Sequence, residues 1–356
     1  MIRVLVIDDS AVMRGIMSRI INAQPDMTVA AVASDPVVAM EQLRRLSPDV
    51  ITLDVEMPRM NGLEFLPRLM ASRPVPVVMV SSLTAQGAEV TLRALELGAV
   101  DFVAKPVLTT EEEIAAYAEE VADKLRAAAG ARLGRTTTRG AAAVPRLAAG
   151  RALASKFIVI GASTGGVEAL RELLVPLPAG MPPILVAQHM PAGFTRSFAQ
   201  RLNSLCAIAV KEGEDGEPLQ PGHAYIAPGG KHMTVGARTG RLETRLSEDP
   251  PINRHRPSVD ALFRSASEAG GRHCIAVLLS GMGADGAEAM VGLRRAGSHN
   301  IVQDEASCVV FGMPKRAIAL NAVHDVLPPS AIARRLVELC MRKADAVPAA
   351  SAGRAP

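Results

Sequence analysis

The segment FIVIGASTGGV, residues 157–167, decides the fold of the second half of this chain. Its four leading residues are apolar, as in a buried parallel strand, and a helical pattern begins near Glu168. A serine between glycines at such a turn can stand exposed at the strand end, because glycine tolerates the sharp backbone and lets a substrate approach. The first N–H groups of the helix would offer partial positive charge beside Ser163. The turn is therefore compatible with a nucleophile, a phosphate-binding loop or a plain tight turn.

The length and composition predict two domains with aliphatic cores. The chain has 356 residues, whereas single cores stop growing near roughly 250–300 residues. Aromatic residues make up 3% and Trp is absent, which disfavours the aromatic surfaces that bind nucleic acids. The cysteines form no CxxC pair, so we expect reduced, mostly buried thiols and not a metal site. They are Cys206, Cys274, Cys308 and Cys340.

Neither a secretory nor a membrane-spanning segment is indicated. Asp8 and Asp9 interrupt the first apolar run, which argues against a signal peptide. No apolar stretch approaches the roughly 20 residues that a membrane span needs. We therefore expect a cytoplasmic protein without direct membrane insertion.

The net charge of +3 comes from one segment of the chain. Between Lys124 and Val167 there are eight basic residues and no acidic one, which leaves 31 basic against 36 acidic residues elsewhere. This stretch is rich in Ala, Gly, Arg and Thr without an apolar stripe, so residues 126–153 are predicted to form a flexible basic linker. The linker would separate domains at 1–125 and 154–344, followed by a disordered tail at 345–356. The basic charge thus does not indicate a nucleic-acid-binding domain.

Apolar strands and helical patterns alternate on both sides of this linker, which predicts an α/β fold in each half. In the first half we expect a doubly wound, five-stranded parallel sheet, with strands at 2–7, 28–33, 49–53, 76–81 and 100–103 and helices near 11–23, 35–46, 61–71, 85–96 and 111–126. In the second half we expect a mostly parallel sheet with antiparallel hairpins at one edge, because turn signals are frequent between 212 and 246. Its strands are expected at 156–160, 184–188, 206–210, 274–279 and 300–303, before a final helix near 329–343.

Three carboxylates follow strands of the first predicted sheet. Asp8 and Asp9 end the first strand and Asp54 ends the third, so all three should meet at the carboxyl edge. Like charges this close need a cation, and oxygen ligands suit Mg²⁺. Ser81 closes the fourth strand and Lys105 the fifth, which would complete a site for a phosphoryl group with Asp54 as the nucleophile.

The first half carries Asp8–Asp9, Asp54 within LDVEMPRMNG, Ser81, and AKP at 104–106. On these residues it resembles the receiver domain of two-component response regulators. The resemblance implies phosphoryl transfer from a histidine kinase to Asp54, with Mg²⁺ held by Asp8, Asp9, Asp54 and a nearby backbone carbonyl. Phe102 lies where that family often has an aromatic residue that swings on activation.

A serine nucleophile in the second half would need a base and an acid that orients it. His189 directly follows the apolar strand 184–188, so it should emerge at the same sheet edge as Ser163. Asp285, in LLSGMGADG at 278–286, follows another apolar strand and is our candidate acid; its alternative role is to cap the helix at 287–295. We predict a Ser163–His189–Asp285 triad. The other histidines are expected at the surface: His223, His232, His255, His273, His299 and His324.

Two other functions compete with this prediction. A nucleotide-binding output domain would use 161–166, but Ser163 replaces the middle glycine of GxGxxG and no acidic residue ends the second strand to hold a ribose. A transcriptional output domain is disfavoured because the second half is too long, strand-rich and not basic. The order Ser–His–Asp also differs from the Ser–Asp–His order of α/β-hydrolases.

The second half carries the motifs IGASTGG, QHMP, HRPSVD at 255–260 and SGMGADG. On these motifs residues 154–343 resemble the catalytic domain of the chemotaxis response-regulator methylesterases, the CheB family, and with the receiver-like half only the linker is unmatched. The resemblance implies that Ser163 attacks a glutamate γ-methyl ester and releases methanol, while His189 accepts the proton and Asp285 orients the imidazole. It also implies an oxyanion hole at the Met282 N–H and a supporting role for Thr164. Because a general base and one oxyanion donor suffice for a methyl ester, we expect no cofactor for the ester hydrolysis.

The same resemblance implies the partners and a regulated state. Methyl-accepting chemoreceptors would be the substrates and a chemotaxis histidine kinase the phosphodonor, with glutamine deamidation as a related reaction. We expect a monomer without a nucleic-acid partner. The long linker would permit docking and undocking, so we expect the unphosphorylated receiver to cover the triad and phosphorylated Asp54 to release it.

Overall fold

Five parallel strands form the sheet of the first half of the chain, in the order β2-β1-β3-β4-β5. The computed structural model describes residues 1–57, 60–106, 110–131 and 156–341. The strands are β1 (Ile2–Ile7), β2 (Met27–Ala33), β3 (Val50–Asp54), β4 (Val77–Ser81) and β5 (Asp101–Ala104). The helices are α1 (Ala11–Asn22), α2 (Pro36–Arg45), α3 (Gly62–Ser72), α4 (Ala85–Glu96) and α5 (Glu111–Ala129).

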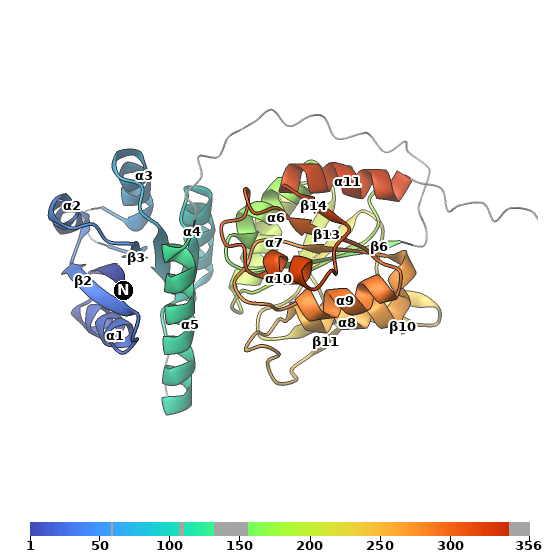
Figure 1. The fold of residues 1–356 in the computed structure, drawn as a ribbon, viewed down its shortest axis with the longest axis horizontal. Helices are drawn as coiled ribbons and strands as arrows, with labels where there is room; N and C mark the ends of the chain where they lie inside the picture. Colours follow the sequence, from blue (N-terminus) through green and yellow to red (C-terminus); the bar gives the residue numbers. More distant parts are fainter. Residues whose placement is uncertain (58–59, 107–109, 132–155, 342–356) are drawn as a thin grey trace, which may run out of the picture.

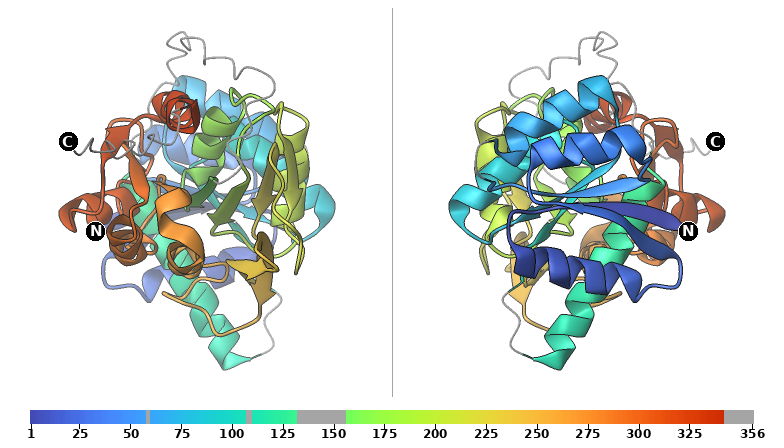
Figure 2. Two further views of the ribbon diagram at one scale, coloured as in Figure 1. Left: turned by 90° about the vertical axis from the view of Figure 1, so that its right-hand side faces the viewer. Right: turned by 90° about the vertical axis from the view of Figure 1, so that its left-hand side faces the viewer.

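Helices cover both faces of this sheet, which is why its central strands are buried along their whole length. α1 and α5 pack on one face, and α2, α3 and α4 pack on the other (Figure 2, right). The doubly wound parallel sheet predicted from the sequence is confirmed. α5 continues to Ala129, beyond residue 126 where the linker was expected to begin, because its last turns bury Leu125 and Ala128 against the core. The remaining linker, from residue 132 to 155, and the predicted tail lie outside the described residues.

Seven parallel strands form the sheet of the second half, in the order β14-β13-β12-β6-β7-β9-β8. They are β6 (Phe157–Ala162), β7 (Ile184–Gln188), β8 (Ala209–Glu212), β9 (His223–Ile226), β12 (Cys274–Leu278), β13 (His299–Gln303) and β14 (Asp325–Leu327). The helices are α6 (Gly166–Leu174), α7 (Phe194–Asn203), α8 (Val259–Gly270), α9 (Ala287–Arg295), α10 (Met313–Ala319) and α11 (Pro329–Met341), with a 3₁₀ turn, η1 (Gly271–His273).

The strand order of this second sheet reverses beside β6. The chain passes from β6 to β7 on one side and later returns to β12 on the other. Crevices that bind ligands form at such a reversal, outside the carboxyl ends of the strands. The fold therefore places its natural binding crevice where β6 and β12 end.

The segment 212–246 differs in detail from the expected set of edge hairpins. β9 lies inside the main sheet, between β7 and β8 and parallel to both. Its Tyr225 is fully buried, which favours this interior position over the sheet edge. Only β10 (His232–Arg238) and β11 (Arg241–Ser247) form an antiparallel hairpin, and they make a separate two-stranded sheet. The hairpin packs on α8 through Met233 and Val235, so apolar burial and not the main sheet holds it in place.

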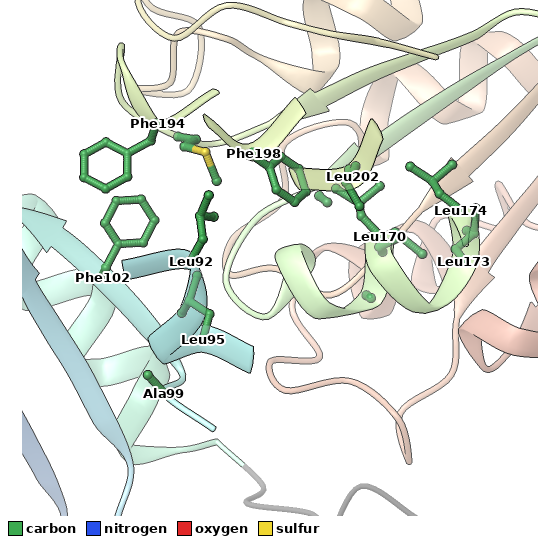
Figure 3. Packing of buried hydrophobic residues seen from close by; sticks show 14 of the residues in the cluster. Leu92, Leu95, Ala99, Phe102, Leu170, Leu173, Leu174, Phe194, Phe198 and Leu202 are labelled. Atoms are coloured by element: carbon green, nitrogen blue, oxygen red, sulfur yellow. The ribbon is translucent and has the colours of Figure 1, made fainter. Parts of the chain in front are cut away.

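The two halves pack against each other through α4, β5 and α5 of the N-terminal unit, residues 1–131 (Figure 1). The facing surface of the C-terminal unit, residues 156–341, is formed largely by α6 and α7. Figure 3 shows one apolar cluster that runs from Leu92 across the boundary to Phe198. At its centre the rings of Phe102 and Phe194 stack with their centroids 4.5 Å apart. Within the described residues, no helix combines the length and apolar character that crossing a membrane requires.

The stability of the C-terminal unit should depend on β6. Ile160 is fully buried in the middle of this strand, so Ile160→Ala leaves a cavity and should lower the free energy of unfolding by about 2–5 kcal/mol. Chemical denaturation measures the loss. As a control, Ile318→Ala on α10, where the residue is 36% exposed, should change it by less than about 0.5 kcal/mol. Equal losses in the two variants would contradict this account of the core.

Candidate functional site

Ser163 stands at the sharp turn between β6 and α6. Gly165, the residue before α6, has a positive φ of 78°, which favours glycine, so the chain can reverse within two residues of the serine. Two backbone hydrogen bonds fix the turn: the Ser163 N–H donates to Ser280 over 3.0 Å, and the Gly166 N–H donates to Ser163 over 2.7 Å. The loop after β12 lies directly against it, because a Cβ added at Gly281 would lie 2.7 Å from the Ser163 Cβ.

His189 follows β7 and reaches both of the other predicted residues. Its Nδ1 lies 3.1 Å from the Ser163 hydroxyl oxygen, and its Nε2 lies 2.8 Å from Oδ2 of Asp285. The His189 N–H donates to the carbonyl of Ala162 over 3.1 Å, which ties the start of the loop to β6. The side chain is 7% exposed. The structure thus brings the predicted serine, histidine and aspartate into one hydrogen-bonded chain.

Asp285 accepts hydrogen bonds from four protein groups besides His189. Burial alone disfavours its ionised form, but the hydrogen bond and charge of His189, together with the other donors, outweigh burial and lower the pKa of Asp285. Because the carboxylate only accepts, Nε2 of His189 must carry a proton and Nδ1 presents its lone pair to Ser163. The four groups are the Asn253 amide (2.9 Å), the Ser258 hydroxyl (2.9 Å) and the N–H groups of Val259 (2.7 Å) and Asp260 (3.2 Å).

The alternative role of Asp285, to cap α9, is filled by another residue. α9 begins at Ala287 without a side-chain cap from its own segment. Instead, Oδ1 of Asp260 accepts from the N–H groups of Gly286 (3.0 Å) and Ala289 (3.3 Å). Asp285 is therefore not needed as the cap of α9 and is free to pair with the imidazole of His189.

The segment 252–260 contributes several residues that sequence reasoning did not assign to the site. Asn253, Ser258 and Asp260 hold Asp285 as described, and His255 stacks on His189 with ring centroids 3.6 Å apart. The motif HRPSVD at 255–260 contributes to the family resemblance, but no role was predicted for any of its residues. The expectation that the remaining histidines lie at the surface is wrong for His232, which is 2% exposed, and His255 is packed in the site.

Thr164 and Met282 lie beside Ser163 in different surroundings. The Thr164 hydroxyl donates to a carboxylate oxygen of Asp101, on β5 of the N-terminal unit. Asp101 in turn lies 3.6 Å from the Lys124 ammonium of α5. No hydrogen bond among the described residues uses the Met282 N–H, in the loop that presses on Ser163. Sequence reasoning missed Asp101 and Lys124 because they join the site only when the two units dock.

Four of the five residues predicted for a phosphoryl site in the N-terminal unit lie together, and the fifth, Ser81, ends the neighbouring strand β4. Ligand oxygens of Asp8, Asp9 and Asp54 lie within 4.8 Å of one another, and Oδ2 of Asp8 is buried without a hydrogen-bond partner among the described residues. The Lys105 ammonium lies 2.8 Å from Asp54 and 3.7 Å from Asp8, while the buried Ser81 hydroxyl donates to the carbonyl of Gly87 over 3.2 Å. This set of hard oxygen atoms with an unsatisfied carboxylate fits a divalent cation such as Mg²⁺.

Opposing effects act on the pKa of Asp54. Burial raises its pKa to about 6, the Lys105 hydrogen bond opposes that rise, and the nearby charge of Asp8 adds to it. Asp54 is therefore ionised at neutral pH but close to neutralisation.

The chain is similar to known proteins over most of its length. Residues 158–336 match the CheB methylesterase family, and residues 4–119 match the response regulator receiver domain. The protein-glutamate methylesterase/protein-glutamine glutaminase of Bordetella parapertussis is 56% identical over 337 residues, 94% of this chain and 96% of the relative. An enzyme of the same name from Cupriavidus pinatubonensis is 54% identical over 338 residues, 94% and 95% of the two chains. The crystal structure of the Thermotoga maritima CheB methylesterase catalytic domain is 44% identical with a TM-score of 0.51, covering 52% of this chain and 98% of that one.

The pKa of Asp54 should follow the charges that surround it. In magnesium-free buffer the carboxyl group should titrate near pH 6. Asp8→Asn removes a negative neighbour and should lower this pKa, whereas Lys105→Met removes the cation and its hydrogen bond and should raise it. The carboxyl ¹³C shift of Asp54, followed by NMR as a function of pH, measures all three values. A pKa that neither substitution moves would contradict this electrostatic account.

Proposed function

Because this chain belongs to the CheB methylesterase family and carries a receiver domain, we propose that it is a phosphorylation-regulated serine esterase that hydrolyses glutamate γ-methyl esters on chemoreceptors. It is a protein-glutamate methylesterase, as its relatives are named. The observation that carries the mechanism is the chain of hydrogen bonds from Ser163 through His189 to Asp285, at the carboxyl ends of neighbouring strands.

The proposed reaction proceeds through an acyl-enzyme. Nδ1 of His189 takes the Ser163 proton as Oγ attacks the ester carbonyl, and the resulting imidazolium is stabilised by Asp285. Collapse of the tetrahedral intermediate breaks the bond to the methoxy group, which leaves as methanol with the proton from His189. Water then attacks the glutamyl-serine ester with His189 as base, which regenerates Ser163 and releases the glutamate carboxylate. A glutamine amide would follow the same path with ammonia as the leaving group.

The negative charge of the tetrahedral intermediate needs a donor beside Ser163. The Met282 N–H meets this need, since it is otherwise unused within the described residues and its loop touches Ser163. One such donor contributes about 10²–10³ in rate, and a general base about 10²–10⁴. Thr164 would support the site with its hydroxyl once that group is released from Asp101. These terms suffice for a methyl ester without an organic cofactor.

The receiver domain would accept a phosphoryl group on Asp54 from a histidine kinase. Mg²⁺ held by Asp8, Asp9 and Asp54 would offset the charge of the carboxylates and the phosphoryl group. Lys105 and Ser81 lie at the ends of β5 and β4, where they can pair with the new phosphoryl oxygens.

Docking of the receiver explains how phosphorylation would control the esterase. β5 carries Asp101 and Phe102, so it links the phosphoryl site at Lys105 to the contacts with Thr164 and Phe194 over four residues. A shift of β5 toward the phosphoryl group would withdraw both contacts. The receiver therefore inhibits by occupying the surroundings of Ser163, and phosphorylation opens them.

The nucleophile is tested by replacing Ser163. Ser163→Ala should lower methanol release from membranes that carry radiolabelled methylated receptor by at least about 10³-fold, because it removes the hydroxyl that forms the acyl-enzyme. Ser204→Ala, at the exposed end of α7, is the matched control and should keep wild-type activity. A Ser163→Ala enzyme that keeps full activity would exclude this mechanism.

The docked interface is tested by reversing one of its charges. Arg201 on α7 pairs with Glu96 on α4 at 3.0 Å, so Glu96→Arg should weaken docking and raise basal methanol release roughly fivefold, since an exposed ion pair contributes up to about 1 kcal/mol. Adding Arg201→Glu restores an opposite pair and should bring activity back down. Glu41→Arg, on the exposed surface of α2, should have no effect.

The same methanol-release assay tests activation by phosphorylation of Asp54. A small-molecule phosphodonor with Mg²⁺ should raise wild-type activity, and Asp54→Asn should abolish that response. Unchanged activity after phosphorylation would be incompatible with release by Asp54.

A further inference from the structure

The residues 252–255 form a tight hairpin that points into the esterase site. Ile252 and His255 exchange backbone hydrogen bonds of 3.1 and 2.9 Å, and the two residues between them have positive φ values of 51° and 66°. This is the geometry of a type I′ turn, whose second central position favours glycine. Here that position holds Arg254, which is therefore in a conformation unfavourable for a long side chain. The turn fixes the direction in which His255 leaves the backbone.

The ring of His255 lies flat on the ring of His189. The centroids are 3.6 Å apart and the planes differ by 15°. No hydrogen bond among the described residues uses a ring nitrogen of His255. The face of the ring, and not its nitrogens, therefore makes the specific contact.

The triad leaves one motion of His189 unrestrained. Hydrogen bonds at Nδ1 and Nε2 hold the ring along the line from Ser163 to Asp285, but the ring can still tilt about that line. Tilting carries the Nδ1 lone pair out of alignment with the hydroxyl, and a misplacement of about 1 Å costs up to about 10² in rate. A flat partner against the face of the ring blocks the tilt.

His255 can take this role only as a neutral ring, because His189 becomes a cation during the reaction. The charged or titratable groups around His255 are His189, Asp285, Arg254 and Lys124. Burial lowers the pKa of His255 to about 3, and the neighbouring positive charges add to the effect while Asp285 opposes it. At neutral pH the stacked ring thus adds no charge that would oppose the His189 imidazolium.

We propose that His255 is a positioning residue of the esterase, which fixes the plane of the His189 ring against Ser163. The inference rests on the proposed mechanism, in which His189 is the general base. The hydrogen bonds of the triad do not fix the tilt of the His189 ring, and a residue of the hairpin at 252–255 supplies that restraint.

The test compares two substitutions in the full chain, activated with a phosphodonor and Mg²⁺. His255→Ala should lower kcat about 10²-fold with little change in KM, whereas His255→Phe keeps a flat uncharged ring and should retain activity within about threefold.

His223→Ala is the matched control, since His223 also stacks on a ring, Tyr225, but outside the site, and it should keep wild-type kcat. Thermal unfolding of each variant separates loss of fold from loss of positioning. Wild-type kcat in His255→Ala, or a His255→Phe enzyme as inactive as His255→Ala, would overturn the proposal; the second result would mean that the ring nitrogens act. If Ser163→Ala, assayed in parallel, were active, the proposed function and not this inference alone would fail.

Discussion

Parallel strands end at one edge of their sheet, and every group in the esterase site depends on that constraint. β6, β7 and the loop after β12 deliver Ser163, His189 and Asp285 to the edge where the strand order reverses. The three side chains therefore meet at one edge of the sheet. The hydrogen bond from the Ser163 N–H to the carbonyl of Ser280 then ties the end of β6 to the loop after β12.

Two buried carboxylates of this chain show how surroundings set chemical roles. Asp285 has four donors besides His189 and stays ionised, which suits a residue that stabilises an imidazolium. Asp54 has a like-charged neighbour in Asp8 and one cation in Lys105, and its pKa is raised to about 6. A carboxylate with so few donors keeps a reactive oxygen, as a phosphate acceptor requires.

The sequence was sufficient for the features that depend on local patterns. Apolar runs located the five strands of the first sheet and five of the seven strands of the second, and polar residues at strand ends located Ser163, His189 and Asp285, which the structure brings together. His255 could not be placed in this way, because it belongs to a turn that has no glycine to mark it, and Asp260 lies in the first turn of α8 and not at a strand end. The partner of Thr164 was equally hidden, since Asp101 reaches it only through docking of two units. β9 and β14 were both missed, because turn signals surround the four residues of β9 and because β14 has only three residues.

If Thr164 supports the reaction as proposed, its hydrogen bond to Asp101 gives the substrate an effect on the receiver. A ligand at Ser163 and the docked receiver would then require the same Thr164 hydroxyl, so each would displace the other. Coupling free energies between two binding events are reciprocal, and the factor by which docking weakens ligand binding is also the factor by which the ligand weakens docking. Under the proposed function, a high local concentration of methylated receptors would therefore shift the chain toward the undocked state before any phosphoryl group arrives. Phosphorylation and substrate binding would then act on the same docking equilibrium.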